Sequence, residues 1–224
     1  MSDILVRATG LRREFGNGQS PVVAVAEATF EIREGDRIAL VGPSGSGKTS
    51  LLHLIAGLDR PSAGVIEWPA LGSAEDLRPG PVAIAFQGPS LLPPLSVAEN
   101  VALPALLAGG ANSDAMAAAE ALLEELGLSD VASKLPEEIS GGQAQRAGVA
   151  RALTGRPRLI LADEPTGQLD RGSAAELINV MFRHVEAAGA ALVIATHDAS
   201  VAERMPLRWT ITERELQTGA PCTF

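Results

Sequence analysis

Hydrophobic residues follow two periodicities along the chain. Short apolar runs rich in β-branched residues predict strands at residues 4–7, 22–32, 37–41, 82–86, 158–162 and 191–195. Apolar residues spaced three to four apart predict helices at 49–56, 114–126 and 143–153. Residues 61–81 are rich in turn formers and predict an irregular connector. Buried strands that alternate with amphipathic helices are typical of an α/β fold with a parallel sheet.

Polar signals and pattern changes mark the boundaries of these elements. Ser113 can cap the helix at 114–126. The sequence SAAE at 173–176 matches a capping box and predicts that another helix starts there. Helical patterns dominate from about residue 90 to 155, which predicts a helical subdomain. We expect one domain over residues 1–224, with this insert at 90–155 and a core at 1–89 and 156–224.

Residues 42–49 read GPSGSGKT and lie between a predicted strand and a predicted helix. Glycines let backbone N–H groups converge on phosphate oxygens, and the positive end of the following helix points at the same place. The chain has two lysines, Lys48 and Lys134, and one falls on the position such a loop requires. A turn that matches by accident is the weaker alternative. The expected phosphate-binding residues are Gly42, Pro43, Ser44, Gly45, Ser46, Gly47, Lys48, Thr49 and Ser50.

The apolar run at 158–162 ends in two carboxylates, Asp163 and Glu164. In an open α/β sheet the ligand crevice lies at the carboxyl ends of the strands, so both should face the phosphates. Asp163 is suited to hold Mg²⁺ together with Thr49, and Glu164 is suited to deprotonate an attacking water. A solvated pair that caps the loop before Pro165 is the alternative.

Gln87 and His197 also directly follow predicted strands. Gln87 could contact the metal or the water, and His197 could donate a hydrogen bond to a terminal phosphate. Taken singly, Gln87 is better explained by a surface turn, and a cap before a helix is a ready alternative for His197. Several polar residues at successive strand ends are harder to explain by chance.

A second glycine turn, Ser140, Gly141, Gly142 and Gln143, opens the helix at 143–153. A glycine turn at a helix N-terminus is a second candidate anion site. Two different phosphate cradles in one chain suggest two half-sites, which a twofold head-to-tail dimer would complete. An ordinary helix cap is the alternative.

Composition and charge narrow the classes of partner. The 18 basic and 27 acidic residues give a net charge of −9, and aromatic residues make up 3% with no Tyr. Both features disfavour nucleic-acid binding. The single cysteine, Cys222, excludes a disulfide within the chain. The N-terminus lacks an apolar signal segment, and the apolar run at 101–108 is short and contains Pro104, so we expect a soluble cytoplasmic protein.

Together these motifs resemble the ATP-binding cassette (ABC) ATPase family, in the same order and over essentially the whole chain. The stretch SGGQAQR is the specific element, because other phosphate-loop classes lack it. The resemblance identifies the Walker A loop at 42–49, the Q-loop at Gln87, the signature at 140–146, Walker B at 159–164, the D-loop at 166–170 and the switch histidine at His197.

This resemblance implies ATP hydrolysis with ATP and Mg²⁺ at a nucleotide-sandwich dimer. It implies a P-loop NTPase core with a parallel sheet, an N-terminal antiparallel β subdomain and the helical insert. The partners would be a second cassette, forming a homodimer, and a separate integral-membrane permease. The chain would then lie peripherally on the cytoplasmic face of the membrane. The implied nucleotide contacts include Phe15, Asp170 and the turn at 140–143.

Within the family, TGQLD and the stretch from Phe86 to Pro104 are similar to lipoprotein-releasing, macrolide- or peptide-exporting and cell-division cassettes. A cassette that transmits force or a signal without transport is therefore the alternative function. Phe15 stands where the family often has an adenine-stacking Tyr, and Gln168 where Asn is common. Four apolar residues could contact the permease or simply fill the core: Leu91, Leu92, Leu95 and Val97.

Overall fold

The computed structural model describes residues 3–16, 21–88 and 90–219, so Cys222 lies outside the described residues. Its nine strands form one mixed sheet in the order β4-β1-β2-β9-β8-β3-β7-β6-β5. The strands are β1 Ile4–Phe15, β2 Val22–Arg33, β3 Arg37–Val41, β4 Ala63–Glu67, β5 Val82–Ala85, β6 Leu159–Asp163, β7 Ala191–Ala195, β8 Leu207–Thr212 and β9 Glu215–Thr218.

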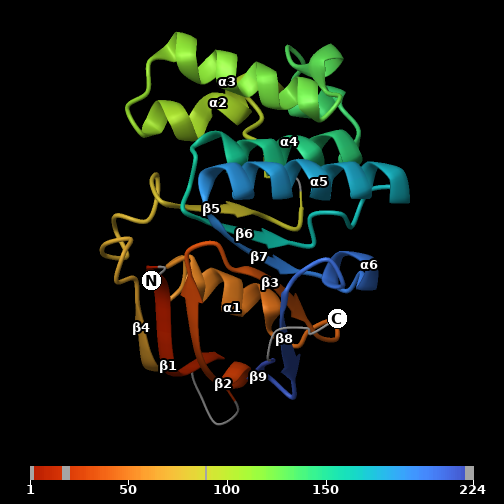
Figure 1. Ribbon diagram of the computed structural model, residues 1–224. Coiled ribbons are helices and arrows are strands. Elements are labelled where there is room, and N and C mark those ends of the chain that lie inside the picture. Colours follow the sequence, from red (N-terminus) through yellow and green to blue (C-terminus); the bar gives the residue numbers. More distant parts are fainter. Residues whose placement is uncertain (1–2, 17–20, 89, 220–224) are drawn as a thin grey trace.

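Helices cover the sheet and form a separate layer at one end of the molecule (Figure 1). Helices α2 and α3 lie farthest from the N-terminal strands, and α4 and α5 lie between them and the sheet. The helices are α1 Lys48–Ile55, α2 Val97–Leu107, α3 Asn112–Glu125, α4 Gly141–Thr154, α5 Arg171–Ala188 and α6 Ala199–Ala202, with 3-10 turns at Ser129–Val131 and Pro136–Glu138.

The expected parallel sheet is present. Strands β8, β3, β7, β6 and β5 pair in parallel, in that order. Strands β1, β2 and β4 pair antiparallel, as the family resemblance implied. Because β3, β7, β6 and β5 are direct neighbours, the segments that follow their carboxyl ends emerge side by side.

Three expectations about strands are wrong. Strand β1 extends to Phe15 rather than ending at residue 7, because β2 pairs with it as far as Val22. The connector at 61–81 contains β4, a mostly exposed edge strand whose two large apolar residues, Val65 and Ile66, make too short a run to predict it. The C-terminal hairpin of β8 and β9 was not predicted; its short strands are built against β3 and against each other.

Two predicted helix caps are also wrong. Helix α3 begins at Asn112, and Ser113 lies inside it instead of capping it. Helix α5 begins at Arg171, because the Asp170 carboxylate accepts hydrogen bonds from the backbone N–H groups of Gly172 and Ser173. The SAAE box at 173–176 therefore lies within α5. Asp170, three residues before the SAAE sequence, is the residue that caps the helix.

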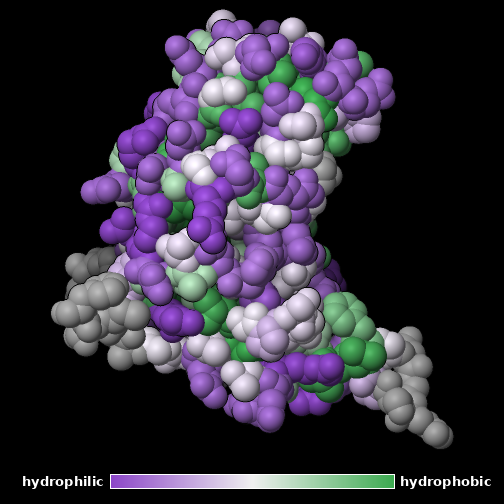
Figure 2. Space-filling view, turned by 90° about the vertical axis from the view of Figure 1, so that its right-hand side faces the viewer, coloured by the Kyte–Doolittle hydropathy of each residue, from purple (hydrophilic) through white to green (hydrophobic). Residues whose placement is uncertain are grey.

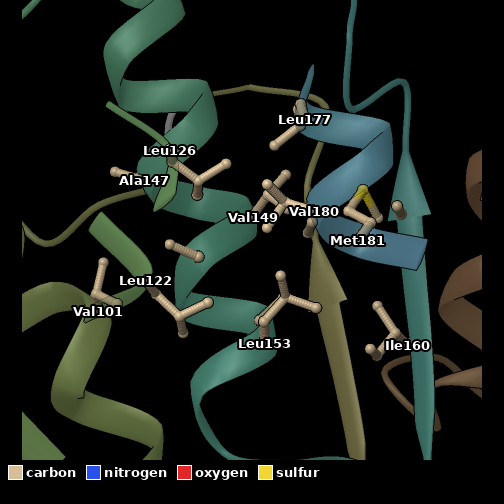
Figure 3. Close-up of a cluster of buried hydrophobic side chains, with 14 of the residues drawn as sticks. Val101, Leu122, Leu126, Ala147, Val149, Leu153, Ile160, Leu177, Val180 and Met181 are labelled. Atoms are coloured by element: carbon tan, nitrogen blue, oxygen red, sulfur yellow. The ribbon is translucent and has the colours of Figure 1, made fainter. Parts of the chain in front are cut away.

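Buried side chains form one core on each side of the sheet. Figure 3 shows Val101, Leu122, Leu153 and Met181, from α2, α3, α4 and α5, in one row of buried side chains that leads to Ile160 of β6. The helical layer thus shares a continuous core with the sheet. Leu91 and Val97 belong to this core, whereas Leu92 is exposed.

Within the described ranges, no helix has both the length and the apolar character needed to cross a membrane. Hydrophilic residues cover much of the face seen in Figure 2, and the hydrophobic areas there are separate patches.

Candidate active site

A cleft of about 1070 Å³ lies at the carboxyl edge of the parallel strands. It collects side chains and backbone from at least six separate segments of the chain. It is lined by Phe15, Val22, Val23, Ala24, Ser44, Gly45, Gly47, Lys48, Thr49, Ser50, Gln87, Gly88, Asp163, Glu164, Gly167, Gln168, His197 and Arg214. Most of the predicted site residues therefore meet in one hollow.

The loop between β3 and α1 is shaped by its glycines. Gly47 has φ +108°, and a Cβ on it would lie 2.1 Å from the carbonyl oxygen of Ala24. No side chain fits there, so β2 and the loop can approach closely. The Ser46 hydroxyl is buried and has no hydrogen-bond partner among the described residues. The loop thus ends in a helix N-terminus beside an unused polar group, which suits a phosphate.

Lys48 is 9% exposed and folds back over its own loop. Its Nζ donates to the carbonyl oxygens of Gly42 at 2.9 Å and Pro43 at 3.1 Å. Those contacts keep the ammonium group at the mouth of the phosphate loop. A phosphate in the cleft can accept from the ammonium group, since Lys offers three donors and no acceptor.

Thr49 and Asp163 meet across the cleft floor, where the Thr49 hydroxyl donates to Asp163 Oδ2 at 2.6 Å. Burial raises the pKa of Asp163, and the neighbouring Glu164 charge raises it further. The hydrogen bond from Thr49 and the positive charges of His53 and Lys48 oppose this rise. A hydroxyl and a carboxylate side by side form the oxygen donor set that Mg²⁺ prefers, so these residues fit that ion.

Glu164 and His197 form a close pair at the ends of β6 and β7. Their Oε2 and Nδ1 atoms are 2.7 Å apart, and the Glu164 side chain is 11% exposed whereas that of His197 is 75% exposed. Glu164 adopts φ +49°, which is uncommon for a residue with a side chain. Its N–H donates to the Ala195 carbonyl oxygen at 2.9 Å, so the neighbouring strand holds this backbone.

Gln87 and Phe15 lie at other walls of the cleft. Gln87 follows β5 and lines the cleft, as its position after a strand predicted. The Phe15 side chain is 43% exposed, and the Arg13 guanidinium lies 4.3 Å from the centre of its ring. Asp59 holds that guanidinium through a 2.7 Å ion pair. An aromatic ring in this place is suited to stack on a planar base.

The signature turn and Asp170 are not brought to this cleft. All of residues 140–143 are described, and none of them lines it. Ser140 caps α4 in a reciprocal box with Gln143, and a Cβ on Gly141 would lie 2.5 Å from Gln168 Oε1. The carboxylate of Asp170 caps α5, and the hydrogen bonds from Ser173 lower its pKa. Neither the signature turn nor Asp170 is therefore part of the cleft lining.

Sequence reasoning missed part of the lining. Gly167 and Gln168 lie within the TGQLD motif and could have been inferred from it. Arg214 comes from the turn between β8 and β9, and nothing in its local sequence points to the cleft. The other missed residues are Val22, Val23, Ala24 and Gly88.

Comparison with known proteins agrees with this geometry. Residues 25–167 match the family described as "ABC transporter". A lipoprotein-releasing system ATP-binding protein LolD from Legionella pneumophila (strain Paris) is 41% identical over 212 residues, covering 92% of this chain and 93% of the relative. The LolD protein of Gluconobacter oxydans (strain 621H) is 40% identical over 218 residues, covering 94% of each chain.

The fold is also similar to a solved cassette. The dimeric post-hydrolysis state of the ATP-binding cassette MJ0796 bound to ADP and Pi superposes with a TM-score of 0.90 and 29% identity, over 98% of this chain and 100% of that one. The family match contains the motifs from the phosphate loop to Glu164, and the structural match covers almost the whole chain. The chain therefore belongs to the ABC transporter family and is the ATP-binding, ATP-hydrolysing subunit of such a transporter.

Proposed function

We propose that two copies of this chain hydrolyse ATP at composite sites, and that this drives a separate membrane permease which releases lipoproteins. The observation that carries the composite site is the separation of the two phosphate cradles. Most of the phosphate loop lines the cleft, through Ser44, Gly45 and residues 47–50, while the turn at 140–143 lies outside it. A second copy related by a twofold axis could supply that turn.

In this proposal the cleft residues have separate roles in the binding and hydrolysis of ATP. The backbone of residues 42–50 and the Lys48 ammonium group hold the phosphates, and Phe15 stacks on adenine. Thr49, Asp163 and Gln87 would hold Mg²⁺, which when bound offsets negative charge on the phosphate oxygens. Glu164 accepts the proton of the attacking water. His197 orients the Glu164 carboxylate and donates to the terminal phosphate.

The partner copy closes the site. Ser140, Gly141, Gly142 and Gln143 contact the terminal phosphate from the opposite side, and Asp170 lies in the loop that meets the partner. The helical segment at 90–155 acts as a subdomain that carries this turn. Hydrolysis removes the phosphate that both chains share, and the dimer then opens.

A complementation experiment tests the composite site. The Lys48→Ala chain lacks a working phosphate loop, and the Gly142→Asp chain places a negative charge where the partner's phosphate would lie. Each variant alone should be inactive. A one-to-one mixture forms heterodimers with one intact site, so about a quarter of the wild-type sites return.

Two controls support the experiment. Gly142→Asp should keep its own nucleotide affinity, because its phosphate loop is unchanged. A mixture with no more turnover than either variant alone, under conditions where tagged chains form ATP-dependent heterodimers, would contradict the shared site.

A groove at the edge of the sheet is suited to a helix of the permease. It has a volume of about 610 Å³ and lies between β5, α2 and α4. Its apolar wall includes Phe86, Leu92 and Leu107, all exposed. Arg78 and Arg156 lie on its rim, and Arg78 Nη1 is buried without a hydrogen-bond partner among the described residues. We propose a short cytoplasmic helix with an apolar face and a carboxylate near the arginines.

Co-expression with the permease tests this surface. Leu107→Glu should reduce the amount of the chain recovered with the membrane fraction, while ATP turnover of the free chain is unchanged. Val65→Glu, an equally exposed apolar position on β4, is the matched control. Equal recovery of both variants with the membrane fraction would exclude the groove as the docking site of the permease.

The proposed cargo rests on the relatives. Two of them, described above, are named as parts of lipoprotein-releasing systems and match more than 90% of this chain. On this proposal the chain sits peripherally on the cytoplasmic face of the membrane. Depletion of the chain should leave lipoproteins in the membrane from which they are normally released, and their normal release would contradict the proposal.

A further inference from the structure

The buried side chain of Gln145 joins helix α4 to the loop after β6. Gln145 is 5% exposed. Its Nε2 donates to the backbone carbonyl oxygen of Glu164 at 2.8 Å, and its Oε1 accepts from the backbone N–H of Gln168 at 2.9 Å. One amide group therefore spans the two ends of the segment 164–168.

At one end of this bridge, Glu164 has an energetically unfavourable backbone conformation. With φ +49°, Glu164 occupies a region that costs a non-glycine residue about 1–3 kcal/mol unless its surroundings maintain it. Its carbonyl oxygen also accepts from the Gly167 N–H at 3.1 Å, which closes a turn within the same loop. The Gln145 amide is a tie to this carbonyl from another secondary-structure element, so it helps set the direction of the Glu164 side chain.

Helix α4 begins in the signature turn, close to Gln145. Gly141 and Gln145 are about one helical turn apart. Gln145 accepts from the Gln168 N–H, and the Gln168 side chain lies so near Gly141 that a Cβ there would be 2.5 Å from Gln168 Oε1. A helix is stiff over one turn, so a displacement of residues 140–143 moves the Gln145 amide with it. The same short segment thus links the turn to the loop that carries Glu164.

We infer that Gln145 is a positioning residue that couples the turn at 140–143 to the Glu164 backbone of the same chain. The inference rests on the proposed function, in which this turn binds the partner's nucleotide and Glu164 acts on the chain's own nucleotide. Binding at one composite site then orients the base of the other. This contact makes the two sites cooperative.

Steady-state kinetics of the Gln145→Met variant test the coupling. Methionine fills a similar volume but makes neither hydrogen bond. We expect kcat to fall roughly 10- to 100-fold because the base is misplaced, nucleotide affinity to change less than about twofold, and the Hill coefficient for ATP to fall to about 1. Thr154→Val is the matched control, since Thr154 is buried on the same helix and its hydroxyl donates to Ala150.

Gln145→Glu separates the two contacts and covers the case in which the methionine variant does not fold. When its carboxyl group is ionised, it can still accept from Gln168 but cannot donate to the Glu164 carbonyl oxygen, whereas the protonated group can make both contacts. The inference therefore requires kcat of this variant, relative to wild type at the same pH, to fall as the pH rises and the carboxyl group ionises. A kcat equal to that of wild type across the whole pH range in which the protein is folded would overturn it.

A double variant distinguishes this inference from the proposed function on which it rests. If Gln145 acts through Glu164, Gln145→Met should cause little further loss in a Glu164→Gln background. The same fold-loss in both backgrounds, or an unchanged kcat in the single variant, would overturn the coupling. Failure of the proposed function would look different, since Glu164→Gln alone would then retain normal turnover.

Discussion

Nδ1 of His197 lies 2.7 Å from Oε2 of Glu164, although the two residues follow different strands. Strands β6 and β7 are direct parallel neighbours, with Asp163 opposite Ala195, so the residues after them emerge together. The pair combines a nearly buried carboxylate with an exposed imidazole. The carboxylate is held in place from one side, and its other oxygen can face a water in the cleft.

Replacing Glu164 with Gln should leave ATP binding intact and reduce turnover by about 10²–10⁴-fold, because the amide cannot accept the proton from water. The variant should accumulate as an ATP-bound dimer in size-exclusion chromatography with light scattering. Glu176→Gln, an exposed change on α5, is the control. Normal turnover of Glu164→Gln would exclude Glu164 as the base.

Replacing Lys48 with Ala should weaken nucleotide affinity, because the ammonium group at the mouth of the loop is removed. Titration with a fluorescent ATP analogue measures the change. The exposed Lys134, replaced in the same way, removes the other lysine and one positive charge without touching the cleft. Equal affinities of the two variants would contradict the assigned phosphate contact.

A methyl group at Gly47 should displace the phosphate loop. The new Cβ would meet the Ala24 carbonyl oxygen, and φ +108° is strained for any residue with a side chain. We expect Gly47→Ala to lose ATP affinity and at least about 1 kcal/mol of stability, measured by calorimetry and denaturant unfolding. Gly10→Ala also has a positive φ, +56°, but open space around it, so it should keep its ATP affinity.

Asp163 should oppose folding at neutral pH in the absence of ligands. Its pKa is raised in the folded state, chiefly by burial, so the folded protein holds this proton more tightly than the unfolded chain. The contribution of Asp163 to the free energy of unfolding therefore falls as the pH rises past the ordinary pKa range of aspartate and through the raised pKa of the folded state. Asp163→Asn should raise the Tm at about pH 7, with a smaller gain near pH 4, and should abolish Mg²⁺-supported turnover. A Tm of Asp163→Asn below that of the wild type at both pH values would contradict a raised pKa of Asp163 in the folded state.

Much of the fold and of the cleft was predictable because the signals are local. The phosphate loop, the acid pair and the polar residues after β5 and β7 each lie within a few residues of an apolar strand. The parallel pairing of those strands then brings them together. The start of α5 was mispredicted because Asp170 and the SAAE box are both valid caps, and the choice depends on how the preceding loop packs.

The sequence alone determined which chemical groups are available and that they follow the strands of a parallel α/β sheet, because those signals are contiguous in the chain. Tertiary structure decided that Arg214 reaches the cleft, that β4 adds an edge strand while the β8–β9 hairpin joins β2 to β3 within the sheet, and that Gln145 bridges Glu164 and Gln168. These features join segments that are far apart in the chain or, in β4, depend on an edge strand whose residues are mostly exposed. Their stability comes from long-range pairing and burial, which no local sequence pattern encodes.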